Sequence, residues 1–196
     1  MHHFPHLLLA LLASTPSDEA KAALAPFQKT LKETLFKALE RSTEAAVEVC
    51  SERAPALARE ASTARVTVGR SGLKLRNPAN APPAWLPPLL DELSKLPPGT
   101  QTGRTVTLPD GRVGYAEPIW TAPPCLVCHG PVIAPGLDAT LRARYPADAA
   151  RGFAPGSFRG VFWAEVAPAA AKPDGGLQPP KMRPSAPRDT NPEIPR

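Results

Sequence analysis

Residues 100–120 read TQTGRTVTLPDGRVGYAEPIW, and this stretch decides the fold class. The segments 100–108 and 112–120 flank Pro-Asp-Gly at 109–111, a turn sequence in which proline presets one backbone angle and glycine allows a positive φ. Two strand-like segments around such a turn predict a β-hairpin. The chain therefore contains an antiparallel sheet.

A long helical pattern precedes the hairpin. Apolar residues between positions 24 and 49 recur at spacings of three, four or a multiple, which is typical of a helix with one apolar face. Thr-Pro-Ser-Asp at 15–18 is typical of a helix start, with a capping threonine, a proline in the first turn and an acid three residues later. We expect the helix to end before Pro55, with Cys50 in its last turns.

Shorter elements complete the predicted fold. A strand is expected at 66–68, short helices at 89–96 and 136–145, and a last strand at 158–166. One long helix followed by an antiparallel sheet, with short helices in the connections, makes the fold class α+β.

The two ends of the chain differ from its middle. Residues 1–16 contain an apolar run at 7–13, far shorter than the ~20 residues of a membrane-spanning helix and typical of a secretory signal peptide. Prolines, charges and small residues dominate 168–196, which predicts a disordered Pro-rich tail. The expected organisation is a signal peptide at 1–16, a single folded domain at 17–167 and this tail.

The composition bounds the core and the partners. Aromatic residues make up 6% of the chain, so we expect a modest, aliphatic core that leaves room for a cofactor to supply buried surface. The net charge of +5 comes without a basic run or an aromatic-interleaved basic patch, which disfavours nucleic acid as a partner and only weakly favours acidic ones. No transmembrane span is expected. The partner is expected to be a redox or signalling protein, whose identity the sequence does not give, and the sequence does not indicate the oligomeric state either.

Residues 125–129 read CLVCH, the C-x-x-C-H attachment sequence of c-type haem. Two thiols three residues apart can form thioethers with the two vinyl groups of one porphyrin, and the next histidine can then coordinate the iron. A zinc site needs a second Cys/His pair, and a thioredoxin-like pair needs a βαβ context; neither is present. We expect one covalent haem c, held by Cys125 and Cys128, with His129 as an axial ligand.

Few side chains in the sequence could serve as the second axial ligand. The other histidines, His2, His3 and His6, lie in the predicted signal peptide, and Met182 lies in the predicted tail. Cys50 remains, without a disulfide partner in the chain once the motif cysteines hold haem. A small buried hydrophobic side chain is the alternative role for this cysteine, and a lysine, a tyrosine or an open site are the alternative occupants of that face.

Six segments carry a further pattern: AVEVCSERAP at 46–55, VGRSGLKLRNPAN at 68–80, EPI at 117–119, CLVCHG at 125–130, YPADAARGF at 145–153 and GSFRG at 156–160. In combination they resemble a family of bacterial c-type haem proteins with a PAS-like fold, over about residues 20–167. The resemblance implies a PAS-like sheet with a long N-terminal helix, and axial ligation by His129 and Cys50. Its relatives look like sensory input modules.

Three arginines are candidate partners of the haem propionates: Arg70, Arg76 and Arg159. A guanidinium matches a carboxylate in bidentate fashion, which favours arginine for this role. Lys74 in the same stretch is interpreted as an ordinary solvated charge.

These features together predict an exported, periplasmic monohaem c-type cytochrome that acts as a haem-based redox (or ligand) sensor or signalling module. A thiolate ligand should keep the reduction potential of the haem iron low. Release of Cys50 on reduction or protonation would alter the helix that carries this residue. A simple electron carrier is the alternative. A haem enzyme such as a peroxidase needs a general acid or base, and the mature chain has no histidine besides His129. No catalytic residue and no enzyme activity are therefore expected.

Overall fold

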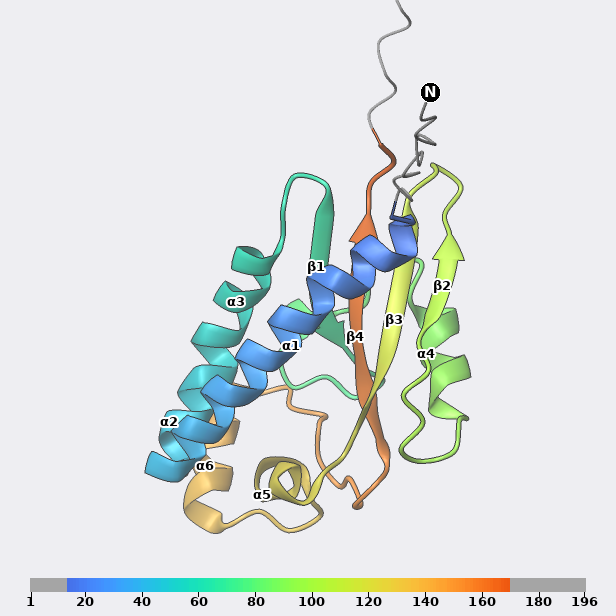
Figure 1. Ribbon diagram of the computed structural model, residues 1–196. Coiled ribbons are helices and arrows are strands. Elements are labelled where there is room, and N and C mark those ends of the chain that lie inside the picture. Colours follow the sequence, from blue (N-terminus) through green and yellow to red (C-terminus); the bar gives the residue numbers. More distant parts are fainter. Residues whose placement is uncertain (1–13, 170–196) are drawn as a thin grey trace, which may run out of the picture.

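The computed structural model describes residues 14–169, and this part of the chain is α+β, as predicted (Figure 1). The predicted signal peptide lies outside the described residues up to position 13, and the predicted tail lies outside them from position 170. In chain order the elements are α1 (Pro16–Arg41), α2 (Thr43–Glu48), a π-helical turn (Val49–Arg53), α3 (Ala54–Ala61), β1 (Val66–Ser71), a 3-10 turn (Pro78–Asn80), α4 (Pro87–Ser94), β2 (Arg104–Thr107), β3 (Val113–Trp120), a 3-10 turn (Pro123–Cys125), α5 (Leu126–His129), α6 (Pro135–Arg144) and β4 (Phe158–Val166).

Helix α1 begins where the sequence predicted. The Asp18 N–H donates to the Thr15 hydroxyl (3.2 Å), and the Thr15 N–H donates to the Asp18 carboxylate (3.3 Å). This reciprocal capping box satisfies two backbone donors that have no partner within the helix.

The predicted single helix is in fact two helical segments, which corrects the first expectation. The chain turns at Ser42, whose backbone is extended (φ −169°, ψ 163°), and α2, the π turn and α3 then run back alongside α1 (Figure 1). The Ser42 hydroxyl accepts the Ala45 N–H at 3.1 Å, so the same residue starts the second segment as its N-cap. The apolar spacing continues across this turn, which is why periodicity alone did not reveal it.

The second segment also continues past Pro55, where the sequence predicted an end. In the π turn the Ala54 N–H pairs with the Val49 carbonyl, five residues back instead of four. Pro55 then falls in the first turn of α3, where a missing N–H needs no partner. The helical run therefore extends to Ala61.

The four strands form one antiparallel sheet in the order β1-β4-β3-β2. The predicted hairpin is its β2–β3 edge, with Arg104 opposite Ala116, and the predicted last strand is β4. β4 lies between β1 and β3, so the chain closes the sheet with its final element. At the end of β3 the register shifts between Ile119, which is opposite Gly160, and Trp120, which is opposite Phe158, so Arg159 of β4 is an extra residue without a partner in β3.

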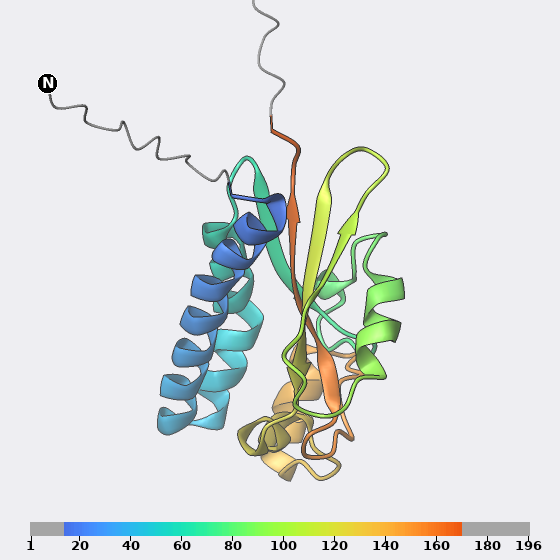
Figure 2. The same cartoon turned by 45° about the vertical axis from the view of Figure 1, so that its right-hand side comes forward.

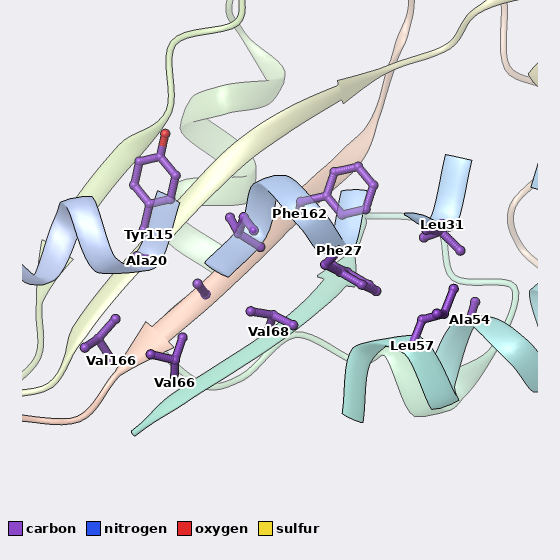
Figure 3. Packing of buried hydrophobic residues seen from close by; sticks show 12 residues of the cluster. Ala20, Phe27, Leu31, Ala54, Leu57, Val66, Val68, Tyr115, Phe162 and Val166 are labelled. Carbon is purple, nitrogen blue, oxygen red and sulfur yellow. The ribbon is translucent and has the colours of Figure 1, made fainter. Parts of the chain in front are cut away.

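Helices cover both faces of the sheet (Figure 2). On one face α1 and α3 pack through Phe27, Leu31 and Leu57 against Val68 and Phe162, as Figure 3 shows. On the other face α4 packs on Ala116 and Val161. Neighbouring residues of β4 thus serve opposite cores, because side chains alternate across a strand. Among the described residues, no helix combines the length and apolar character needed to cross a membrane.

Candidate functional site

A cavity of about 470 Å³ lies beyond the end of the sheet core, where α1, α2, α5 and α6 converge (Figure 1). Its volume falls within the ~300–1,000 Å³ of typical ligand pockets. Most of the lining surface is apolar, and the polar side chains on it include three thiols, one imidazole, three guanidiniums, two lysine ammonium groups and one carboxylate. Such a lining favours a large apolar ligand fixed by a few specific contacts.

Helix α1 builds one wall of this cavity with its C-terminal half. The buried apolar residues before Leu31 pack on the sheet. Leu31 packs on the sheet and also lines the cavity, and Leu35, Phe36 and Leu39 line the cavity beyond it. The lining positions follow the three- and four-residue spacing of one helix face. Phe36 is 44% exposed, which leaves apolar surface for a ligand to cover.

The C-x-x-C-H segment forms the opposite wall. Cys125, Cys128 and His129 all line the cavity, because residues i, i+3 and i+4 lie on one side of a helical turn. Val127 points elsewhere and is 44% exposed. The turn ends at Gly130, whose N–H donates to the Leu126 carbonyl at 2.9 Å. The two motif cysteines are free thiols, so both sulfur atoms can react.

The imidazole of His129 is neutral and held in one tautomer. Burial, followed by the positive charges of Arg159 and Arg76, lowers its pKa to about 2. Nδ1 lies 2.7 Å from the Ala150 carbonyl oxygen, which can only accept, so Nδ1 carries the proton. The ring also packs edge-on against Phe153 at 6.2 Å between centroids. Nε2 is left with a free lone pair, the state needed to bind a metal.

Cys50 lies on the π turn and lines the same cavity as the motif. π turns occur preferentially at functional sites, where they re-aim a side chain. Burial raises the pKa of the Cys128 thiol; Arg76 opposes this, and the thiols of Cys50 and Cys125 reinforce it. The structure thus brings together the four residues on which the sequence prediction concentrated.

Two of the three predicted arginines reach the cavity without a carboxylate partner in the described part of the chain. Arg70 donates to the Cys50 carbonyl at 3.5 Å, and Arg159 donates to the Lys74 carbonyl at 3.5 Å while its guanidinium lies over the Phe153 ring. Burial, followed by the charges of Arg70 and Arg76, lowers the pKa of Arg159 to about 10. This concentration of positive charge favours an anionic group in the cavity.

Arg76 has different partners. Its Nε lies 3.1 Å from Oδ2 of Asp148, and its terminal nitrogen donates to the carbonyls of Cys128 and Ala150. Arg76 therefore contacts the attachment segment itself as well as lining the cavity.

Two acidic residues of the site were not identified from the sequence. Asp148 is buried beside Arg76, and Glu117 lines the cavity between Tyr115 and Gln28. One Glu117 oxygen accepts the Tyr115 hydroxyl and the other accepts the Gln28 amide, each at 2.7 Å. The spacing of Tyr115 and Glu117, two residues apart on a strand, placed them on one face and was the available signal.

A zinc site is not favoured by this arrangement. Structural zinc needs about four Cys, His or carboxylate ligands around one point. Over residues 14–169 no three such side chains are grouped closely enough to hold a metal ion.

Comparison with known proteins identifies the family and the fold of the chain. A family model described as Tll0287-like matches residues 13–167. The crystal structure of the cyanobacterial heme-protein Tll0287 is similar to this chain with a TM-score of 0.57 and 24% sequence identity, over 81% of this chain and 99% of that one. The likeness to that structure confirms the fold. No curated protein matches the sequence.

Proposed function

The chain belongs to the Tll0287-like family, and from this membership and the site we propose that it is a haem protein that carries one haem c. The observation that carries the proposal is that both motif thiols and the unprotonated Nε2 of His129 belong to one apolar cavity. Cys125 and Cys128 would form the two thioethers, and His129 would be an axial ligand. The related Tll0287 is named a heme-protein, which supports the same cofactor.

We assign the second axial position to Cys50. It is the one cysteine outside the motif, and it lines the cavity from the helical hairpin that faces the motif. A thiolate would need compensation for its charge, and Arg70 lies within contact of the Cys50 backbone.

Arg70 and Arg159 suit the haem propionates best. Both guanidiniums reach the cavity, and neither has a carboxylate partner within residues 14–169. An anionic group there would remove the cost of holding two cations together in a partly buried site.

For the biological role we propose redox sensing. Haem supplies one-electron chemistry at its iron, and a thiolate ligand favours the ferric state. Cys50 sits on the π turn that joins α2 to α3, so its release or protonation would change the restraint on that hairpin. This gives a two-state element whose balance depends on the ligation of Cys50.

A simple electron carrier is the second candidate function. Val127 is apolar, 44% exposed and located inside the attachment motif, which would offer a partner a contact close to the cofactor. An enzyme is the least supported candidate. Glu117 is the one carboxylate on the cavity lining, and each of its oxygens already accepts a hydrogen bond, so it is poorly placed to act as a general acid or base.

We also propose that the protein is exported to the periplasm. The apolar run near the N-terminus and the attachment of haem c outside the bacterial cytoplasm both support this location. Fractionation of cells that express the full chain would test it, and haem-bearing protein confined to the cytoplasm would contradict it.

The proposed cofactor is tested by expression in a bacterial host that carries the haem-attachment machinery. Haem staining should survive denaturing electrophoresis for the wild type and be lost in the double variant Cys125→Ala/Cys128→Ala. In the ferric state Cys50→Ala should lose a thiolate-type low-spin spectrum. Ser51→Ala on the same π turn is the matched control and should keep it. An unstained wild type would refute haem c, and an unchanged Cys50→Ala spectrum would refute the second ligand.

A further inference from the structure

The partner of the His129 Nδ1–H is a backbone carbonyl on a loop with little secondary structure. This carbonyl belongs to Ala150, in the segment between α6 and β4. A hydrogen bond at Nδ1 fixes the tautomer and the orientation of an imidazole whose other nitrogen binds a metal. Whatever holds the Ala150 carbonyl in place therefore also positions His129.

The Ala150 carbonyl accepts a second donor, the guanidinium of Arg76, at 3.3 Å. The same nitrogen donates to the Cys128 carbonyl, so one side chain joins the attachment turn to the loop. Arg76 comes from the segment after β1, far from both in sequence. Its position makes it a bridge between the two backbone segments that define the environment of His129.

Arg76 is itself held by Asp148. The side chains are 9% and 3% exposed, and Nε of the arginine lies 3.1 Å from Oδ2 of the aspartate in an ion pair whose angle is not that of a hydrogen bond. Burying such a pair costs free energy that packing apolar groups would not cost. The contribution of this ion pair to stability therefore does not explain its presence here, and we look for a role in the site.

Asp148 also orders the loop directly. Its Oδ1 accepts the Ala150 N–H at 2.9 Å, and its Oδ2 lies 2.9 Å from Nε of Arg151, which in turn pairs with Asp138 of α6. Backbone bonds from Gly152 and Phe153 to the carbonyls of residues 130 and 129 complete the attachment. The backbone of Ala150 is thus held at its N–H by Asp148 and at its carbonyl by Arg76.

We propose that Arg76 and Asp148 are positioning residues for His129, acting through the Ala150 carbonyl to hold the Nδ1–H tautomer and to set how strongly Nε2 donates to the iron. The part about the iron rests on the proposed function. Because the Arg76 cation shares the acceptor, the carbonyl accepts less strongly from Nδ1–H, and the imidazole is a weaker donor than it would be beside a free carbonyl.

The first test uses the haem-free full chain with ¹⁵N-labelled histidine rings. The His129 signal is assigned by its absence in His129→Gln. The wild type should show a single Nδ1–H tautomer with slow proton exchange. In Arg76→Gln the single tautomer should be lost to a mixture of both, and the ring N–H should exchange faster than in the wild type. Arg76→Lys keeps the positive charge and should keep part of the wild-type preference for the Nδ1–H tautomer.

Arg159→Gln is the matched control. It also removes a guanidinium from the cavity, but that guanidinium donates to the Lys74 carbonyl and not to the Ala150 carbonyl. It should leave the tautomer and the exchange rate unchanged. Arg151 still pairs with Asp148 in Arg76→Gln, which favours folding of that variant. If Arg76→Gln does not fold, the double variant Arg76→Gln/Asp148→Asn replaces it in the test, because this variant removes both charges of the buried pair.

The second test is the midpoint potential of the haem-loaded protein. With iron at Nε2 the proton would stay on Nδ1 in every variant, so an Ala150 carbonyl freed from Arg76 would accept it more strongly and make Nε2 a stronger donor. Arg76→Gln and Arg159→Gln each remove one positive charge near the cofactor, so an additional lowering of the midpoint potential in Arg76→Gln reports the stronger imidazole. A wild-type tautomer and exchange rate in folded Arg76→Gln, or equal potential shifts in the two variants, would overturn the proposal. A wild type that takes up no haem when it is expressed with the attachment machinery, but whose His129 tautomer depends on Arg76, would instead refute the proposed function and leave the positioning of His129 standing.

Discussion

Arg70, Arg76 and Arg159 bring three guanidinium groups to one cavity, and their partners differ. Arg76 is paired with a buried carboxylate and with backbone carbonyls, whereas the other two have only carbonyls as hydrogen-bond partners in the described chain. Residue type alone therefore does not assign the three a common role. Their surroundings separate one positioning residue from two anion-binding candidates.

Arg159 gives a prediction about stability in the absence of ligand. Its pKa is lowered to about 10, first by burial and then by Arg70 and Arg76, which means that the folded state carries a cost for its charge at every pH below that value. Arg159→Met should therefore stabilise the haem-free protein at pH 7 by about 1–3 kcal/mol, measured by urea unfolding.

The sign should reverse in the haem-loaded protein, because a propionate would then compensate the charge. Arg41→Met, at an exposed position in the last turn of α1, is the control and should change stability by less than about 0.5 kcal/mol in both forms. Equal stabilisation by Arg159→Met with and without haem would contradict the assignment of this arginine to an anion.

At the same scale, the sequence predicted the residues whose chemistry is uncommon and missed those whose chemistry depends on folding. A C-x-x-C-H segment and a lone third cysteine can be recognised without a fold, and both line the cavity. Asp148 gave no such signal, because its role depends on Arg76, 72 positions earlier in the sequence, being brought beside it. Only the packing of the two loops creates that pair.

At the scale of elements, α1 performs two tasks along its length. The part before Leu31 packs on the sheet, Leu31 contacts both the sheet core and the cavity, and the part from Leu35 faces the cavity, although the apolar spacing is uniform. Periodicity therefore predicted the helix and its start but not where its apolar face changes partner. It also missed the turn at Ser42, because the stripe resumes in α2 with compatible spacing.

The turn at Ser42 can be tested through its cap. Ser42→Ala removes the acceptor of the Ala45 N–H and should destabilise the protein by about 1 kcal/mol in urea unfolding. Thr43→Ala is the control, since the Thr43 hydroxyl contacts only the exposed Glu44 carboxylate and its loss should cost less than about 0.5 kcal/mol. An equal loss in both variants would mean that the cap does not hold the turn.

The connection between α6 and the loop of Ala150 should depend on pH through Asp138. Hydrogen bonds from Arg142 and Arg151 lower the pKa of Asp138 below its ordinary 3.8. A carboxylate with a lowered folded-state pKa contributes stability that is present above the unfolded value and lost as pH falls through the folded one. Asp138→Asn should therefore be less stable than the wild type at pH 7, with a difference that shrinks below about pH 3.8.

Urea midpoints at several pH values measure this difference. Arg142→Gln removes only the partner within α6 and should cost less than Asp138→Asn, because Arg151 still joins the loop to the helix. A difference between wild type and Asp138→Asn that is constant from pH 7 to pH 3 would show that the charge is not responsible.

At the scale of the whole molecule, the chain divides into a part that packs by itself and a part arranged around the cavity. Two apolar clusters fill the two faces of the sheet. Two smaller clusters join α1, α2 and α6 away from the sheet, and Cys128 packs at the edge of one of them. A domain with few aromatic residues can build the first part from aliphatic side chains, but the second part has less buried surface of its own and gains most from a bound ligand.

Hydrogen exchange measured on the haem-free and haem-loaded chains should reveal this division. Attachment of haem should slow exchange in 43–61 and 126–153, while the strands, which already pair in the sheet, should change little. Reduction then separates the two functional candidates. In a sensor, release of Cys50 should return 43–61 toward the haem-free rate and leave 126–153 protected, and ferric Cys50→Ala should resemble the reduced wild type. In a carrier, both segments keep the same rates in both redox states, an outcome that would remove the switch from the proposed function.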